Sequence, residues 1–316
     1  MSKNAMDDSV NIWEKPKAEQ IYMIAGWEQW ADAGSVSSGL PQYLINHLRA
    51  RKIGEIRPDG FYLFQIPGTH HLLRPQVKFE EGYSKAIKPR VNSLYYAGDS
   101  RKGLVIFIGE EPHMDIDRYA DALFSAAKQL SVRRVALIGG VYGAMPYEKD
   151  REVSCTYSLP YMKDELRKYA VRFSNYEGGA TIGSYLVDRA EQAALELFVF
   201  NAFIPAYDFS EAGLPLQGLR IEDDYRAWYE LMQRLTHMFG LDLDLSDLDR
   251  QSEALVASMH EKLEELETKM PQLNVREYLT MLTNEYRENS FDPLMSCGNE
   301  NWVISSPMMN KLPETS

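Results

Sequence analysis

Cysteine, histidine and long apolar runs are all scarce in this sequence. Two cysteines, Cys155 and Cys297, occur among 316 residues, and their wide separation argues against a disulfide framework. No stretch approaches the roughly 18 continuous apolar residues that a membrane helix needs. The N-terminal segment lacks the apolar core of a signal peptide. We therefore expect a soluble, cytoplasmic protein that does not insert into membranes.

Positive charge is also in deficit. The chain has 34 Lys and Arg against 46 Asp and Glu, which gives a net charge of −12. Such a surface repels phosphate backbones and anionic lipid head groups, so we expect neither nucleic acid nor a membrane as a partner. Acidity also keeps proteins soluble. The 45% hydrophobic content is enough for a sizeable core.

Apolar runs separated by an amphipathic segment indicate the fold class. The segments "QIYMIAG" (20–26), "GLVIFIG" (103–109) and "RRVALIGG" (133–140) are typical of buried strands. Residues 115–130 carry an apolar stripe at helical spacing. Strand, helix and strand in this order imply a parallel βαβ unit, so we expect an α/β fold with a mostly parallel sheet and helices on both faces. Further strands are predicted at 61–66, 93–98, 151–158 (an edge strand) and 197–205, and further helices at 183–196 and 219–239.

The C-terminal part has a different character. Ser246 is a suitable N-cap for a long amphipathic helix. Asn274, followed three residues later by Glu277, resembles the start of a second helix with a capping box. The pair forms a helical hairpin whose apolar stripe packs either on the α/β body or on another subunit or partner. The predicted divisions are a flexible N-terminus at 1–19, an α/β domain at 20–245, the hairpin at 246–289 and a flexible tail at 290–316.

Loops at the carboxyl ends of strands line the ligand crevice of an open α/β sheet. Four such loops are notable here: 26–34, 109–115, 139–150 and 176–183. If they converge, Asp32, Glu111 and Glu177 would surround one crevice, and Glu111 with His113 could form an acid–base pair. The simpler interpretation is that these acids stabilise helix N-termini and solvate the loops. We favour the second interpretation.

Familiar cofactor, metal and nucleophile motifs are missing. The glycines at 178, 179 and 183 match neither common phosphate-binding loop. His70 and His71 are adjacent, so on a strand they would point to opposite faces and could not chelate together. No G-x-S-x-G elbow occurs. We expect no cofactor, no metal and no catalytic residue set.

The four loops together are informative in another way. "GWEQWADAG" follows the first strand, "GEEP" precedes the 115–130 helix, "IGG" closes the next strand, and "YEGGATIG" precedes a helix. In this order they resemble the proteasome assembly chaperone 2-like family, in its bacterial branch with a helical C-terminal extension. The resemblance covers roughly residues 20–285. The family-motif or pocket residues are Trp27, Asp32, Gly34, Gly109, Glu111, Pro112, Gly139, Gly140, Glu177 and Gly178.

The resemblance implies an α/β sandwich similar to nucleoside phosphorylases, without an established catalytic residue set. Eukaryotic members of the family act as chaperones in assembling the proteasome α-ring. This chain departs from the pattern at two places. "YEKD" follows Pro146 where many relatives carry histidine, threonine, arginine and proline, and "KLPETS" lacks the hydrophobic–tyrosine–any-residue ending that docks relatives into α-ring pockets.

The leading hypothesis is thus a non-catalytic, assembly-chaperone-like protein that binds a protein partner and self-associates as a homo-oligomer. The alternative is a hydrolase- or nucleosidase-type enzyme that uses a carboxylate-lined crevice. A third possibility is a regulator that binds a small ligand in the same crevice without chemistry.

Overall fold

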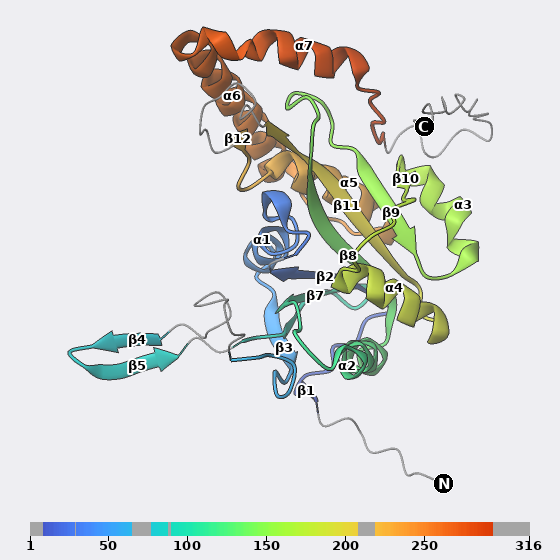
Figure 1. The fold of residues 1–316 in the computed structure, drawn as a ribbon. Helices are drawn as coiled ribbons and strands as arrows, with labels where there is room; N and C mark the ends of the chain where they lie inside the picture. The colour runs from blue at the N-terminus through green and yellow to red at the C-terminus, as the bar shows by residue number, and fades with distance from the viewer. Residues whose placement is uncertain (1–8, 29, 65–76, 88–89, 208–218, 293–316) are drawn as a thin grey trace, which may run out of the picture.

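One large sheet organises the molecule (Figure 1). The computed structural model describes residues 9–28, 30–64, 77–87, 90–207 and 219–292. Within them, ten strands join in the order β1-β3-β6-β7-β2-β8-β11-β9-β10, with β12 paired to β11. In that order the strands are β1 (Val10–Ile12), β3 (Arg51–Ile56), β6 (Ser93–Gly98), β7 (Lys102–Glu110), β2 (Gln20–Glu28), β8 (Val132–Gly143), β11 (Leu197–Tyr207), β9 (Val153–Tyr157), β10 (Arg172–Phe173) and β12 (Leu219–Arg220).

The centre of this sheet is parallel. Strands β7, β2, β8 and β11 run in the same direction, and antiparallel pairs such as β6–β7 and β3–β6 extend the sheet outward. Helix α2 (Ile116–Gln129) connects β7 to β8, and β2 lies between these two strands. The predicted βαβ unit is present, and its two strands are next-nearest neighbours. The expected α/β fold with a mostly parallel sheet is confirmed.

Helices cover both faces of the sheet, and two apolar cores result. Helices α1 (Gly39–His47), α5 (Tyr225–Phe239) and α6 (Ser246–Lys269) contribute to the core on one face. Helices α2 and α4 (Ile182–Gln192) contribute to the core on the other face. Alternate residues of one strand serve different cores: Ile24 of β2 lies in the first and Met23 in the second. The short helix α3 (Lys163–Leu166) lies beside β10.

The C-terminal hairpin consists of α6 and α7 (Val275–Glu285) and packs against α5. Its existence is confirmed. Asn274 is the N-cap of α7, as predicted, but no capping box forms there, and the predicted N-cap of α6 is wrong. Leu245, rather than Ser246, is the N-cap of α6, and Asp244 accepts a hydrogen bond from the Ser246 amide. Asn274 adopts a left-handed conformation (φ 47°) before α7 and makes no side-chain capping bond. The apolar stripe packs on the body through Leu248, Met259, Leu263 and Val275.

Several other predicted elements differ. Residues 61–64 form a turn and irregular chain instead of a strand, while 65 and 66 lie outside the described residues. Strand β9 is flanked by β10 and is not the edge. Helix α5 starts at Tyr225, six residues later than expected, because Leu219 and Arg220 pair with β11. Strand β1 lies within the segment predicted to be flexible. The domain limits stay a prediction, and His70, His71, Cys297 and the C-terminal ending lie outside the described residues.

Candidate functional site

The first predicted loop is held in place by Asp32. Its Oδ1 accepts hydrogen bonds from the Ser37 amide at 2.8 Å and the Ser38 amide at 2.9 Å, and its Oδ2 accepts one from Ser38 Oγ at 2.6 Å. Burial raises the pKa of Asp32 above its usual value, against the opposing effect of these bonds. The carboxylate therefore satisfies the amides that lead into α1, which is a structural role.

Glycines let the chain approach β8 closely at the same corner. The Gly140 amide donates to Ala31 O at 2.7 Å, and a Cβ at Gly140 would lie 2.0 Å from Ala33 O. A Cβ at Gly139 would lie 2.3 Å from Asn201 Oδ1. Gly34 has φ +62°, a conformation that favours glycine. Gly140 packs against the Ala33 backbone, whereas Gly139 packs against the Asn201 side chain and Gly34 against the side chains of Asp224 and Ile204, so no room is left for a ligand at those contacts.

Glu111 has an equivalent role on the other face of the sheet. Its Oε1 accepts a hydrogen bond from the Ile182 amide at 2.9 Å, at the first residue of α4. Burial raises the pKa of Glu111, and the bond from Ile182 lowers it. Thr181 and Ser184 complete the helix start with a capping box. Glu177 and Gly178 lie a few residues before this helix and are exposed. Asp32 and Glu111 thus stabilise helices that cover opposite faces.

The remaining family-motif residues surround a buried polar chain. Trp27 Nε1 donates to Tyr119 Oη at 2.7 Å, and Tyr119 Oη donates to Asn92 Oδ1 at 3.0 Å. Asn92 Oδ1 lies 2.5 Å from where a Cβ of Gly109 would stand, which explains the glycine there. Pro112 is buried next to this corner. These hydrogen bonds link β2, α2 and the residue that precedes β6 through the core.

His113 adjoins the same corner. Its Nδ1 accepts a hydrogen bond from the Leu63 amide at 3.1 Å, and its ring packs edge-on against Tyr62. Burial, followed by the nearby Arg90 charge, lowers the pKa of His113. Glu111 bonds to Ile182 instead. No interaction between Glu111 and His113 occurs among the described residues, so the proposed acid–base pair gains no support from the geometry.

A second cluster of charges was not anticipated from the sequence. Arg151, after β8, and Asp224, before α5, form an ion pair with Nε–Oδ2 2.8 Å apart and both side chains fully buried. Arg151 Nη1 also donates to the carbonyl oxygens of Tyr147 and Lys149. Asp224 Oδ1 accepts from the amides of Arg226 and Ala227, so it is also the N-cap of α5.

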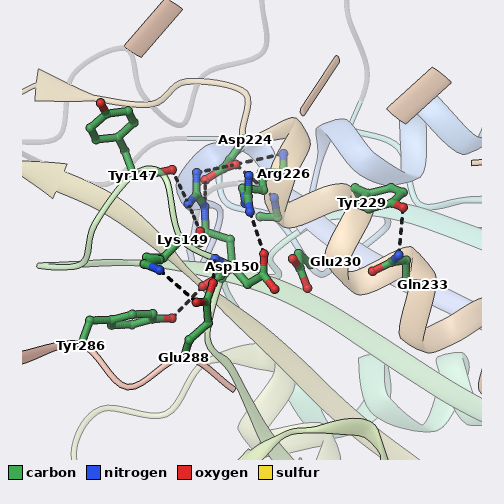
Figure 2. Close-up of polar contacts among 12 residues, drawn as sticks. Tyr147, Lys149, Asp150, Asp224, Arg226, Tyr229, Glu230, Gln233, Tyr286 and Glu288 are labelled. Atoms are coloured by element: carbon green, nitrogen blue, oxygen red, sulfur yellow. Dashed lines mark hydrogen bonds and ion pairs between the residues drawn. The ribbon is translucent and has the colours of Figure 1, made fainter. Parts of the chain in front are cut away.

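Two further carboxyl groups extend the cluster (Figure 2). Arg226 Nη2 donates to Asp150 Oδ1 at 2.6 Å, as Figure 2 shows. Arg234 Nη1 donates to Glu230 Oε2 at 2.8 Å. The carboxyl groups of Asp150 and Glu230 lie close enough to shift each other's pKa. Burial is the main cause that raises the pKa of Glu230 to about 7, and Asp150 adds to it. Hydrogen bonds from Ser290, Arg226 and Glu230 outweigh the effect of burial and lower the pKa of Asp150.

The segment after α7 closes over this cluster (Figure 2). Tyr286 Oη donates to the Asp150 carbonyl at 2.7 Å, and Glu288 Oε1 accepts from the Asp150 amide at 3.0 Å. Lys149 Nζ lies 3.1 Å from Glu288 Oε2. Phe291 is buried against Tyr169 and lies over the Arg234 guanidinium at 5.4 Å. The cluster therefore fixes the C-terminal segment to the sheet and to α5.

The sequence carries one signal for this cluster. Asp224 stands immediately before the apolar stripe of Ala227, Trp228 and Leu231, as an N-cap should. Its partner Arg151 is 73 residues away, and nothing local indicates the pairing. A cavity of about 570 Å³ is formed instead at the opposite ends of the strands, beside Gln20 and Lys102. Asp32, Glu111 and Glu177 do not line it.

The PAC2 family model matches residues 26–263. A comparison with curated proteins finds no significant sequence match. Among the described residues, no helix has the length and apolarity to span a bilayer. The family match contains all ten residues singled out in the sequence, together with Arg151, Asp224 and Glu230, and it ends within α6.

Solved structures share the fold. A Mycobacterium tuberculosis proteasome-assembly chaperone homologue has 21% identity and a TM-score of 0.65, over 77% of this chain and 94% of that one. A PAC2 family protein from Streptomyces avermitilis has 23% identity and a TM-score of 0.65, over 82% and 99%. PbaB of Pyrococcus furiosus, an archaeal proteasome activator, has 18% identity and a TM-score of 0.55, over 81% and 98%.

Proposed function

The chain belongs to the PAC2 family, and on this premise we propose that it acts by binding other proteins, in the manner of an assembly chaperone, rather than by catalysis. The proposal includes self-association as a homo-oligomer and a place in the bacterial branch of the family. It also includes a cytoplasmic location, with neither nucleic acid nor a membrane as partner. Two of the similar structures, a proteasome-assembly chaperone homologue and a proteasome activator, support a role in protein assembly.

One observation carries the proposal. The carboxylates that a crevice enzyme would use are engaged by the backbone: Asp32 by the amides of Ser37 and Ser38, and Glu111 by the amide of Ile182. A carboxylate whose lone pairs hold a helix start in place is poorly available for proton transfer to a substrate. The loops that mark the family therefore serve to stabilise the scaffold.

The hydrolase or nucleosidase alternative would need Asp32, Glu111 and Glu177 to face one substrate. Asp32 and Glu111 stabilise helices on opposite faces of the sheet, and Glu177 is exposed beside α4. The small-ligand regulator depends on the same crevice. The proposed protein-binding role requires none of these groups to react.

Affinity capture from cross-linked cells of the natural host tests the proposal. The tagged wild-type protein should retain a reproducible set of proteins, and a tagged protein of similar size and charge should not. A second copy of the chain counts as a retained protein if it is untagged. Retention of no protein, together with turnover of a nucleoside or ester substrate that is lost in Glu111→Gln, would overturn the proposal in favour of the enzyme.

A further inference from the structure

A two-stranded hairpin projects from the body of the protein (Figure 1, cyan). It consists of β4 (Val77–Glu80) and β5 (Tyr83–Ile87) and forms a small sheet of its own. All nine strand residues are exposed. An isolated two-stranded hairpin is marginally stable in water, and a third strand or a packed face is needed to hold it. We name residues 77–87 the arm.

The two faces of the arm differ. Val77 is paired with Ile87, and Phe79 follows Val77 on the same face. These three side chains are 49%, 61% and 58% exposed in that order. The other face is mixed: Lys78 and Lys85 both form ion pairs with Glu80, and the exposed Tyr83 is paired with Glu80. Alternating apolar and charged residues are typical of a strand that has one face covered, yet the described residues leave the apolar face open.

Further apolar side chains are exposed at a corner of the body. Val91 and Met114 are both exposed there, next to Asn92 and His113, and both of these neighbours contact Tyr62. Met114 also donates its amide to Phe61 O at 3.2 Å, so this corner is part of the ordered core. Exposed apolar side chains such as those of the arm are typical of a protein interface.

The net charge of the arm indicates which partner can bind to it. The arm carries Lys78 and Lys85 against Glu80 and Glu81, so it is neutral, whereas the whole chain has a net charge of −12. Two copies of so acidic a chain repel each other over most of their surface, and the neutral arm is where they can approach. Both of its edges expose backbone donors and acceptors, and an identical strand can pair with them about a two-fold axis.

From the apolar face, the neutral charge and the open edges we infer that the arm is the self-association surface of this protein, occupied by the arm of a second copy. The inference rests on the proposed function and names the partner within it. In the assembled state the arms form one continuous sheet, with Val77, Phe79 and Ile87 of both copies packed together.

Sedimentation velocity over a concentration series tests the inference with the full chain. The double variant Phe79→Glu/Ile87→Glu places charge on the apolar face and should weaken the self-association constant at least about 10-fold, a loss of about 1.4 kcal/mol. Met281→Glu places one negative charge on an exposed position of α7 and should leave the constant unchanged. Circular dichroism and thermal unfolding should be the same for all three proteins, since the substituted side chains are exposed.

A double variant that associates like wild type would overturn the inference and leave the proposed function standing. Loss of association in Met281→Glu alone would also overturn it and would place the interface on the α6–α7 hairpin. A wild-type protein that is monomeric at every concentration overturns the arm as a self-association surface. If that monomer still captures another protein from cells, the proposed function survives; if it captures none, both fail.

Discussion

Arg151 Nε lies 2.8 Å from Asp224 Oδ2, and neither side chain is exposed to solvent. The pair joins the loop after β8 to the first turn of α5. Asp224 also accepts two amide bonds of that helix, and Arg151 satisfies two loop carbonyls. Each charge is thus fully partnered, which is the condition under which a buried ion pair is tolerated.

Removal of one charge of this pair should therefore be costly. Arg151→Ala leaves the Asp224 carboxylate buried without its counter-charge and should lower the free energy of unfolding by about 3–5 kcal/mol. Urea denaturation followed by circular dichroism measures the change. The exposed pair of Arg167 and Asp164 provides the control, and Arg167→Ala should change stability by less than about 1 kcal/mol. Equal losses of stability in the two variants would mean that burial of the ion pair does not determine the loss.

A close backbone approach should make Gly140 intolerant of any side chain. Its Cβ would stand 2.0 Å from Ala33 O, a backbone atom that cannot move aside without shifting the loop. Gly140→Ala should therefore destabilise the protein by about 1–3 kcal/mol. Gly179→Ala is the matched control, because nothing lies within 4 Å of a Cβ there. The prediction fails if thermal unfolding gives the two variants the same midpoint.

Asp32 should prove to be a structural residue. Asp32→Ala leaves the Ser37 and Ser38 amides without their acceptor and should cost about 1–3 kcal/mol of stability. Glu177→Ala removes an exposed carboxylate and should cost less than about 0.5 kcal/mol. Under the enzyme alternative both variants would instead retain stability and lose activity. Chemical denaturation of the two variants, paired with substrate screening, distinguishes these outcomes.

The pKa of Glu230 predicts how stability depends on pH. This pKa rises from 4.5 in the unfolded chain to about 7 in the folded protein. Between these values the folded state holds a proton that the unfolded state has released, so stability from this group falls as pH rises through the window. The pKa of Asp150 is lowered, so this group affects stability only at a more acidic pH than Glu230 does.

Urea denaturation between pH 5 and pH 8 measures this slope. Glu230→Gln cannot ionise, so its stability should decline less with pH than that of wild type, with about the wild-type stability at pH 5. Glu261→Gln replaces an exposed glutamate of α6 and should keep the wild-type slope. Parallel curves for wild type and Glu230→Gln would show that Glu230 is ionised throughout the range.

The central strands could be predicted because each is a continuous apolar run. Burial on both faces imposes this pattern on "QIYMIAG" and "GLVIFIG". Strand β3, "RKIGEI", was not predicted, since it contains charges and a glycine and is ordered by its pairing with β1 and β6. Phe61 misled the prediction in the opposite way: it is fully buried, in edge-on contact with Tyr119, without being part of a strand.

The candidate site, too, could be predicted from the sequence only in part. The family-motif residues were found because they are close in sequence and punctuated by glycine. Their hydrogen-bonding partners follow only from the fold: Ile182 is 71 residues from Glu111, and Tyr119 is 92 residues from Trp27. The Asp150–Glu230 pair and the C-terminal segment over it likewise depend on contacts between α5, the β8–β9 loop and the end of α7.

Native mass spectrometry of the protein purified at natural abundance tests the protein-binding role most directly. One spectrum separates the 36.2 kDa chain from homo-oligomers, from complexes with another protein and from the chain with a small ligand. The proposed role predicts species whose mass exceeds that of the chain by one or more whole proteins. A spectrum that contains the 36.2 kDa chain alone, or the chain carrying only a small molecule, would contradict it.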